Sequence, residues 1–360
     1  MVTIKEIKLS FFIGLWFMVL TFPIMVIKVN TITHTVIFRW SNLLWVGIVG
    51  FFASLVWNYF LRRKEEKKKS DIKDDIPFVH RLLQNERFRI PFLTVLALFF
   101  LVYPFVFPMY HTSIMISALV YVMLGLGLNI VVGLAGLLDL GYVAFYAVGA
   151  YTYALLNLHF GISFWFVLPI SAIFGCIAGT LLGYPVLRLK GDYLAIVTLG
   201  FGEIIRIILE NWDDFSNGPR GIGNIPAPSF FGHQFDQHNS VIYIYFIVIA
   251  LVLMTIFFVG RLENSRIGRA WIALRDDEIA CQAMGIDKFK TKLTAFALGA
   301  TWASIGGVVF AAKTSFINPM SFTIWESITI LCVVVIGGMG SAIGVIAGAL
   351  VLILLPESLR

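Results

Sequence analysis

The stretch Thr112–Leu134 reads TSIMISALVYVMLGLGLNIVVGL and contains no charged side chain. A transmembrane helix needs about 20 apolar residues in succession, so this stretch is long enough to cross a bilayer. It lies within a longer run, Ile90–Leu187, in which Asp139 is the only charged residue. A water-soluble fold cannot hide so long an uncharged run, whereas lipid accommodates it as helices whose backbone hydrogen bonds are internal. The sequence therefore predicts a membrane protein.

The composition of the whole chain agrees with this interpretation. Of its 360 residues, 59% are hydrophobic and 13% are charged, and the mean hydropathy is +0.88. Soluble domains carry roughly 25% charged residues. The apolar runs are long and apolar on both faces, unlike the alternating strands of about 10 residues that form outer-membrane barrels. The predicted fold class is all-α, a polytopic bundle of transmembrane helices.

The chain contains about 11 candidate membrane-spanning helices. They are Leu9–Ile27, Trp40–Leu61, Ile90–Met109, Thr112–Leu134, Gly136–His159, Ser163–Leu187, Gly191–Glu210, Ser240–Gly260, Thr291–Lys313, Phe322–Ile336 and Ser341–Leu355. The predicted organisation is an N-terminal extension with two spans (1–61), a basic cytoplasmic linker (62–89) and a core (90–360).

Basic residues in the loops predict the orientation of these spans, because cytoplasmic loops are enriched in Lys and Arg. The segment Arg62–Lys69 has six basic residues in eight, and Arg261–Lys292 has seven, whereas Asn211–Asn239 has only Arg220. The first two loops are therefore predicted to be cytoplasmic and the third external. An even number of spans must separate the two cytoplasmic loops, so the charged segment Gly191–Glu210 is predicted to cross the membrane. The same parity places the end of the chain outside, and a further C-terminal helix is expected.

Several functional classes are disfavoured. The net charge of +6 lies in loops beside the spans, where it sets topology and does not indicate nucleic-acid binding. The three cysteines, Cys176, Cys281 and Cys332, are far apart and predict neither a disulfide framework nor a metal site. The sequence contains no P-loop GxxxxGK[ST], HExxH or GxSxG motif. It predicts a protein that is not an enzyme and that holds no cofactor or metal.

The loop 261–292 has an amphipathic pattern. Ile272, Arg275, Ile279 and Ala283 share one helical face, and an acidic patch lies on the other side. The patch consists of Asp276, Asp277 and Glu278. Two short helices, broken near Asp276 and capped at Gly285, fit this pattern. From composition alone, the simpler interpretation is a solvated connector.

Four segments change that balance. Residues 269–280 read RAWIALRDDEIA and are followed by Gly285, 125–142 read GLGLNIVVGLAGLLDLGY, 183–206 read GYPVLRLKGDYLAIVTLGFGEIIR, and 337–341 read GGMGS. Taken together along the chain, these segments resemble the permeases of ATP-binding-cassette (ABC) importers for branched-chain amino acids, and the resemblance covers most of 121–355. The two additional N-terminal spans and the basic linker resemble the larger permease of these systems, the LivM type.

The resemblance implies a set of partners and a coupling surface. It implies a bacterial inner-membrane protein that works with a second related permease, two ATP-binding subunits and a periplasmic amino-acid-binding protein, and that carries leucine, isoleucine or valine. The loop 261–292 would dock into the ATPase subunit. The predicted coupling residues are Arg269, Trp271, Arg275, Asp276, Asp277, Glu278 and Gly285.

Polar side chains inside the predicted spans are candidates for the translocation pathway, because burying them in a membrane costs free energy. They are Asn129, Asp139, Glu203, Arg206 and Glu326. Each also has a structural alternative. Glu203 and Arg206 are three residues apart on a helix and can pair with each other. Asp139 can cap a helix, Asn129 can bind a neighbouring helix, and Glu326 can be solvated at the external boundary.

Glycine-rich segments supply the remaining candidates. The external residues Asn217, Gly218, Pro219, Arg220 and Gly221 resemble the family's Gly-Gly-Pro-x-Gly turn, with Asn217 in place of a glycine. They predict either a structural turn or a surface that docks the binding protein. Glycines at 125, 127, 133, 136, 299, 306 and 307 are typical of close helix packing in lipid. The run Gly337–Gly340 predicts either packing or a helix break beside a cavity.

Three other functions are compatible with parts of the sequence. A permease of the same family would fit the sequence equally well if its cargo were urea, short amides or other amino acids. An ion-gradient-driven secondary transporter would work as a single chain without ATP. A membrane scaffold would show no transport at all.

Overall fold

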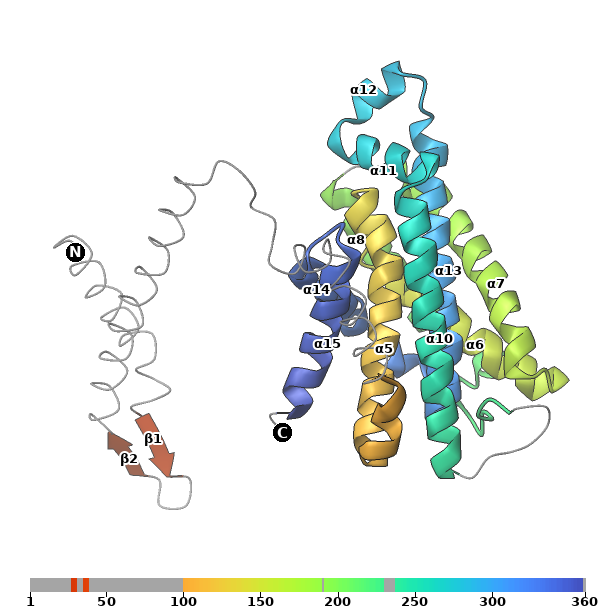
Figure 1. Ribbon diagram of the computed structural model, residues 1–360, viewed down its shortest axis with the longest axis vertical. Helices are drawn as coiled ribbons and strands as arrows, with labels where there is room; N and C mark the ends of the chain where they lie inside the picture. Colours follow the sequence, from red (N-terminus) through yellow and green to blue (C-terminus); the bar gives the residue numbers. More distant parts are fainter. Residues whose placement is uncertain (1–26, 31–34, 39–99, 190, 230–236, 359–360) are drawn as a thin grey trace, which may run out of the picture. The chain divides into compact units, whose positions relative to one another are not determined.

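The computed structural model describes residues 27–30, 35–38, 100–189, 191–229 and 237–358 (Figure 1). The chain forms two compact units, Met1–Val95 and Leu96–Arg360. In the first unit, β1 (Ile27–Asn30) pairs in antiparallel register with β2 (Thr35–Phe38). The predicted spans Leu9–Ile27 and Trp40–Leu61 and the linker 62–89 lie outside the described residues, except for Ile27, which begins β1.

The second unit is a bundle of helices. A helical segment, 100–106, precedes the first complete helix. The elements that follow are α5 (Met109–Asn129), the π-helix η1 (Ile130–Leu134), α6 (Tyr142–Phe160), α7 (Phe164–Val186), α8 (Asp192–Asn211), α9 (Asp213–Ser216), the 3₁₀-helix η2 (Gly218–Arg220), β3 (Ile222–Gly223), α10 (Gln237–Glu263), α11 (Arg266–Asp276), α12 (Glu278–Ala283), α13 (Lys288–Thr314), β4 (Phe316–Ile317), the 3₁₀-helix η3 (Pro319–Ser321), α14 (Ile324–Gly337) and α15 (Ala342–Ser358). The predicted helical character is confirmed, and the short pair β3–β4 is an addition to the helical bundle of this unit.

Within the described residues, five helical segments are long and apolar enough to cross a membrane. They are Met109–Leu134, Phe164–Val186, His238–Glu263, Lys288–Thr314 and Pro319–Gly337. Helix α15 is apolar but shorter. The total of about 11 spans therefore stays a prediction.

The predicted span Gly136–His159 begins too early. Gly136 has a φ of +69°, in the left-handed region, so it interrupts the helical path that η1 follows. Helical geometry resumes only at Tyr142, the first residue of α6. Asp139 consequently lies in a non-helical segment between η1 and α6.

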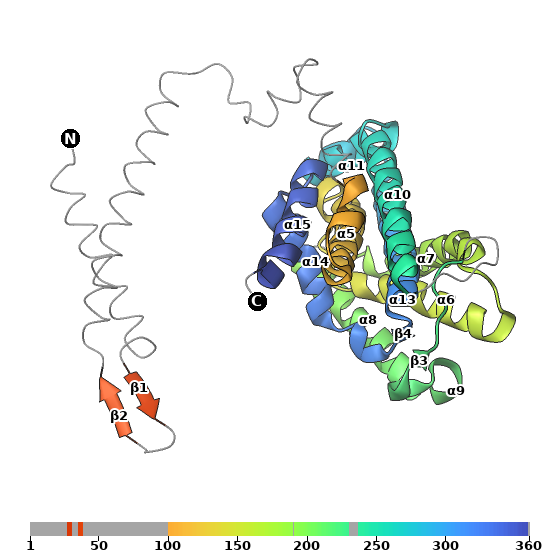
Figure 2. The same cartoon turned by 60° about the horizontal axis from the view of Figure 1, so that its bottom comes forward.

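Helices α5 and α13 form the centre of the bundle, and 83% of the residues in the most apolar part of each are buried. Helix α13 packs against α6 and α7, and α5 packs against α10 and α15 (Figures 1 and 2). Small residues allow this approach. A Cβ atom on Gly149 of α6 would lie 1.8 Å from the backbone oxygen of Ser304, and one on Gly307 would lie 2.1 Å from that of Tyr146. The packing role predicted for Gly307 is confirmed.

The two ends of the bundle carry different elements. Helices α11 and α12 cap one end, which we call the loop end (Figure 1). At the other end, the strand end, β3 pairs with β4 next to α9 (Figure 2). Helix α8 runs between them: Thr198 in its first half accepts a hydrogen bond from Leu140, and β3 follows its last residues. Helix α8 is not among the five segments that are long and apolar enough to cross a membrane, so the crossing that the loop charges predict for Gly191–Glu210 stays a prediction.

Candidate functional site

The predicted pair of short helices is present at the loop end. Helix α11 ends at Asp276, and the side chain of Asp277 caps α12 by accepting hydrogen bonds from the backbone N–H groups of Ile279 (2.8 Å) and Ala280 (3.0 Å). Gly285 follows α12 with a φ of +83°, which favours glycine and ends the helix. Local capping chemistry therefore fixes the break near Asp276 and the stop at Gly285.

Trp271 lies inside the protein, not on the predicted docking surface. Its side chain is fully buried, and its Nε1 donates to the carbonyl oxygen of Thr291 at 2.8 Å. Glu278 forms an ion pair with Lys292, also on α13. A partner protein cannot reach Trp271, because this side chain fastens α11 to the start of α13. The sequence placed Trp271 at the surface because the loop is mostly polar, and polarity does not reveal which side chain faces inward.

Arg275 connects the loop end to the centre of the bundle. Its Nη1 donates to the carbonyl oxygen of Gly133 in η1 at 2.6 Å. A Cβ atom added to Gly136 would lie 2.6 Å from the Cγ of Arg275, and one added to Gly340 would lie 3.4 Å from its Nη1. The arginine therefore contacts three segments: the π-helix, the non-helical segment after it, and the turn between α14 and α15.

The tip of the loop end exposes apolar side chains. Ile279 and Met284 are each 82% exposed, which is unusual for large apolar residues at an end of the bundle predicted to meet water. Among the predicted coupling residues, Arg269, Arg275, Asp276, Asp277 and Gly285 are also exposed. Apolar side chains surrounded by charged ones are typical of a protein–protein contact surface. Sequence analysis placed Ile279 on an apolar face but did not include it, or Met284, among the site residues.

Asn129 stabilises a backbone turn. Its Oδ1 accepts a hydrogen bond from the backbone N–H of Gly340 at 2.8 Å, so it links the end of α5 to the turn between α14 and α15. That turn is the predicted helix break: α14 ends at Gly337, and Gly338 and Gly340 have φ values of +99° and +86°. The structural alternative for Asn129, a hydrogen bond to a neighbouring segment, is the one observed.

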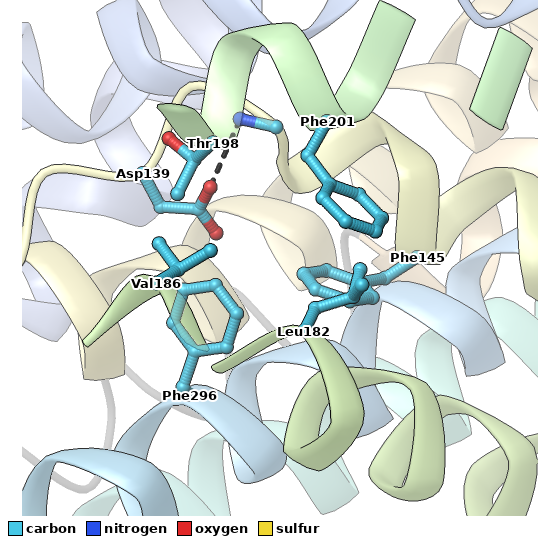
Figure 3. A pocket seen from close by; sticks show the side chains of 8 residues that line it. Asp139, Phe145, Leu182, Val186, Thr198, Phe201 and Phe296 are labelled. Atoms are coloured by element: carbon cyan, nitrogen blue, oxygen red, sulfur yellow. Dashed lines mark hydrogen bonds between the residues drawn. The ribbon is translucent and has the colours of Figure 1, made fainter. Parts of the chain in front are cut away.

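Asp139 is buried beside a very small cavity (Figure 3). Its Oδ1 accepts from the backbone N–H of Gly141, the N-cap residue of α6, at 2.9 Å, while Oδ2 has no partner among the described residues. The cavity, also bordered by Phe145, Thr198 and Phe296, has a volume of about 10 Å³. Such a space holds about one water molecule and no amino acid. Asp139 thus positions the start of α6.

Glu203, Arg206 and Glu210 form an ion-pair ladder on α8. Arg206 contacts Glu203 at 2.8 Å and Glu210 at 2.7 Å, and its Nη1 lies 3.9 Å from the sulfur of Met320 in η3. The predicted Glu203–Arg206 pair is confirmed, and Glu210 is a third member that the sequence argument did not include. The two ion pairs give the guanidinium group of Arg206 nearby counter-charges, which lowers the cost of burying its charge.

Glu326 and Lys313 lie near the strand end, each held by a hydroxyl group of α5. Tyr121 donates to a carboxylate oxygen of Glu326, and the Nζ of Lys313 donates to the Oγ of Ser117. Both charged residues are half-buried. Lys313 was not among the predicted site residues because it ends a predicted span, where lysine usually reaches into the interface. Lys313 has no acidic residue three or four positions away with which it could pair on its own helix, and this feature of the sequence could have marked it as a candidate.

The turn 217–221, which the loop charges predict to be external, is a defined backbone structure. Asn217, with a φ of +61°, donates from Nδ2 to the carbonyl oxygen of Gly221 at 2.7 Å. Asparagine tolerates this left-handed conformation, which explains its presence where a glycine is usual. Gly218 and Gly221 are buried, whereas Asn217, Pro219 and Arg220 are exposed. The structural alternative is therefore realised, and three of the five side chains remain accessible to a partner.

A sequence model of the family described as "Branched-chain amino acid transport system / permease component" matches residues 110–360. The chain belongs to this family. The match covers all the helices from α5 to α15, including the loop end and the half-buried charges near the strand end.

The relatives of the permease include proteins named LivM and proteins named LivH. It is 43% identical to the high-affinity branched-chain amino acid transport system permease protein LivM of Escherichia coli, over 89% of this chain and 79% of that protein. It is 42% identical to LivM of Salmonella typhimurium, with the same two coverages. It is also 24% identical to the permease protein LivH of E. coli, over 64% of this chain and 79% of LivH. No solved structure matches the permease.

These relationships establish the general class of the protein. The permease is a multi-pass membrane component of a bacterial transport system, and its apolar helices agree with a place in the inner membrane. Its likeness to LivM and to LivH shows that two related permease sequences exist in such systems.

Proposed function

We propose that this chain is the LivM-type translocation subunit of an ABC importer that carries leucine, isoleucine and valine. A periplasmic binding protein delivers the amino acid, a second related permease completes the pathway, and two separate ATP-binding subunits supply the energy. The names of the relatives support the cargo and the paired permeases. The ATPases and the binding protein follow from the class of importer.

The observation that carries this proposal is the construction of the loop end. Ile279 and Met284 project from a compact pair of helices whose base is fixed by Trp271 and by the Glu278–Lys292 pair. A rigid base with an exposed apolar tip is suited to receive a partner subunit and to transmit its movement. A flexible connector would need neither the buried tryptophan nor the ion pair.

The same element reaches the interior through Arg275. A displacement of α11 acts directly on the Gly133 carbonyl in η1 and on the turn at Gly340. Short π-helical segments and glycine-rich helix breaks are common at moving or functional sites. Closure of the ATPases would thus move η1 and the α14–α15 turn together and switch the pathway from outward-facing to inward-facing.

The test is reconstitution of the complete system in proteoliposomes. The permease, its partner permease, two ATPase subunits and a leucine-loaded binding protein should take up leucine only when ATP is supplied. The double variant Ile279→Ser/Met284→Ser should lose co-purification of the ATPase subunits, because it removes the apolar tip. The matched control is Lys290→Ala, a charged residue on neighbouring α13 whose side chain is 82% exposed.

Two results would contradict the proposal. Leucine accumulation by the single chain along a proton or sodium gradient, without nucleotide, would indicate a secondary transporter. Uptake of urea or short amides in place of leucine, in a screen with the binding protein, would assign another cargo.

A further inference from the structure

The half of α5 that lies toward the strand end carries a stripe of polar side chains. In Thr112–Leu134 the half-buried residues are Ser113, Ile114, Ser117 and Tyr121, and the rest are buried. Three of these four side chains have hydroxyl groups, and they recur every fourth residue along one face of the helix. Such a face is poorly suited to lipid, which offers hydroxyl groups no hydrogen-bond partner. It is suited to a passage or to a partner with polar groups.

Two of these hydroxyl groups hold opposite charges. Ser117 accepts a hydrogen bond from the ammonium group of Lys313 at the end of α13, and Tyr121 donates one to the carboxylate of Glu326 at the start of α14. Ser117 and Tyr121 are four residues apart, so the two contacts are separated by about 6 Å along the axis of α5. Helices α13 and α14 thus bring a cation and an anion to neighbouring turns on one face of α5.

The two charges do not neutralise each other. Among the described residues, neither Lys313 nor Glu326 has an ion-pair partner within 4.0 Å, whereas Arg206 has two and Lys292 has one. A half-buried charge without a counter-charge is costly in a membrane-embedded helix. A ligand that carries one negative and one positive charge would supply both missing counter-charges and so offset this cost.

An aromatic wall lies beside the charges. Phe310, three residues before Lys313 on α13, packs against Tyr146 of α6 with ring centroids 5.3 Å apart and against Phe322 at 5.8 Å. Tyr146 and Phe322 are themselves 5.4 Å apart. Phe310 is half-buried and lies on the same helical face as Lys313. An apolar group attached to a ligand held by the two charges would find these rings next to it.

We propose that Lys313 and Glu326 form a binding site for the zwitterionic end of an amino acid, with Lys313 taking its carboxylate and Glu326 its ammonium group. The apolar side chain would lie toward Phe310. The proposal rests on the proposed function, and it assigns residues to the recognition of the transported amino acid within the membrane. The site lies toward the strand end, which the loop charges predict to be external, the side from which the binding protein delivers its cargo.

The experiment uses the complete transporter in proteoliposomes with leucine-loaded binding protein. Lys313→Met and Glu326→Gln keep the size of each side chain and remove its charge. Each should lower the initial rate of leucine uptake by about tenfold or more, as expected for one lost charge-assisted hydrogen bond. ATP hydrolysis stimulated by the binding protein should persist, because the loop end is unchanged. Lys313→Arg should recover most of the uptake.

A matched control and a stability measurement separate binding from folding. Arg188→Met removes the charge of an exposed arginine just after α7, outside the loop 261–292, and should leave uptake unchanged. Lys313→Met should not lower the melting temperature, since it removes a poorly solvated charge. Wild-type uptake by Lys313→Met, or a loss of uptake that accompanies a lower melting temperature and that Lys313→Arg does not restore, would overturn the site. A wild-type complex that takes up no leucine would instead reject the proposed function.

Discussion

Arg275 Nη1 donates a hydrogen bond to the carbonyl oxygen of Gly133 across 2.6 Å, and this bond joins two segments that are 142 residues apart in the sequence. Gly133 lies in η1, where the π-helical geometry leaves carbonyl groups outside the regular α-helical pattern. A short helix at the loop end, α11, and the π-helix that continues α5 are therefore linked by a charged side chain. The link is directional, so it can transmit movement of α11 to the bundle.

Replacing Arg275 should uncouple ATP hydrolysis from transport. In Arg275→Met the aliphatic part of the side chain remains, but the bond to Gly133, which is worth about 1.5–3 kcal/mol, is lost. We expect leucine uptake to fall about tenfold or more while the ATPase subunits still co-purify. The control is Arg266→Met, which changes an exposed arginine on the same helix. Unchanged uptake per ATP hydrolysed in Arg275→Met would argue against a role for the link.

Trp271 should behave as a core residue. Trp271→Ala should destabilise the protein by about 3–5 kcal/mol, because it leaves a large cavity between α11 and α13. Trp271→Phe should cost less, since the Thr291 carbonyl oxygen also accepts from the Thr294 hydroxyl at 2.8 Å. The melting temperature in detergent measures both effects. The control, Ile279→Ala, changes a side chain that is 82% exposed and should leave the melting temperature unchanged. If Ile279→Ala lowered the melting temperature as much as Trp271→Ala, the assignment of Trp271 as a core residue would be wrong.

The contact between α6 and α13 should not accept a methyl group. Gly149→Ala places its Cβ against the backbone oxygen of Ser304, which cannot move without separating the two helices. The free energy of unfolding is expected to fall by about 3 kcal/mol, which is at the upper end of the range for overpacked cores. Gly260→Ala is the matched control, because a Cβ there meets nothing within 4 Å and alanine favours a helix by up to about 1 kcal/mol. Expression yield and melting temperature should separate the two variants clearly.

Asp139 should be replaceable by asparagine but not by alanine. Asp139→Asn keeps an oxygen that can accept from the Gly141 N–H and removes a buried group whose second oxygen has no partner among the described residues. Its melting temperature should equal or exceed that of the wild type, with uptake retained. Asp139→Ala leaves the buried N–H unsatisfied and should cost about 1–3 kcal/mol. A folded Asp139→Asn variant without uptake would show that the carboxylate itself takes part in transport.

Patterns that are local in the sequence predicted much of the fold. The uncharged run around Thr112–Leu134 predicted helices in a membrane, and Gly285 predicted the end of the second short helix. The Glu203–Arg206 pair was also predictable, since residues three apart on a helix are neighbours. Each of these inferences depends on one element and its immediate flanks.

Inferences that needed a second element were less secure. Polarity placed Trp271 at the surface, because nothing in the loop sequence shows that its indole faces α13. The uncharged apolar run carried the predicted span back to Gly136, which has a positive φ and whose Cβ position is occupied by Arg275 from a distant helix. Lys313 was passed over because its position at the end of a span is ordinary until Ser117 is brought beside it.

The sequence by itself determined that this protein crosses a membrane as helices, which family it resembles, and that it carries no ATP-binding motif. Hydropathy, charge asymmetry and short motifs are properties of contiguous residues, so they can be read without coordinates. Tertiary structure alone decided which polar groups act on one another: Arg275 with Gly133, Asn129 with Gly340, and Lys313 and Glu326 with neighbouring hydroxyls of α5. The physical reason is that hydrogen bonds and charges act over a few ångströms in space, whatever the distance along the chain.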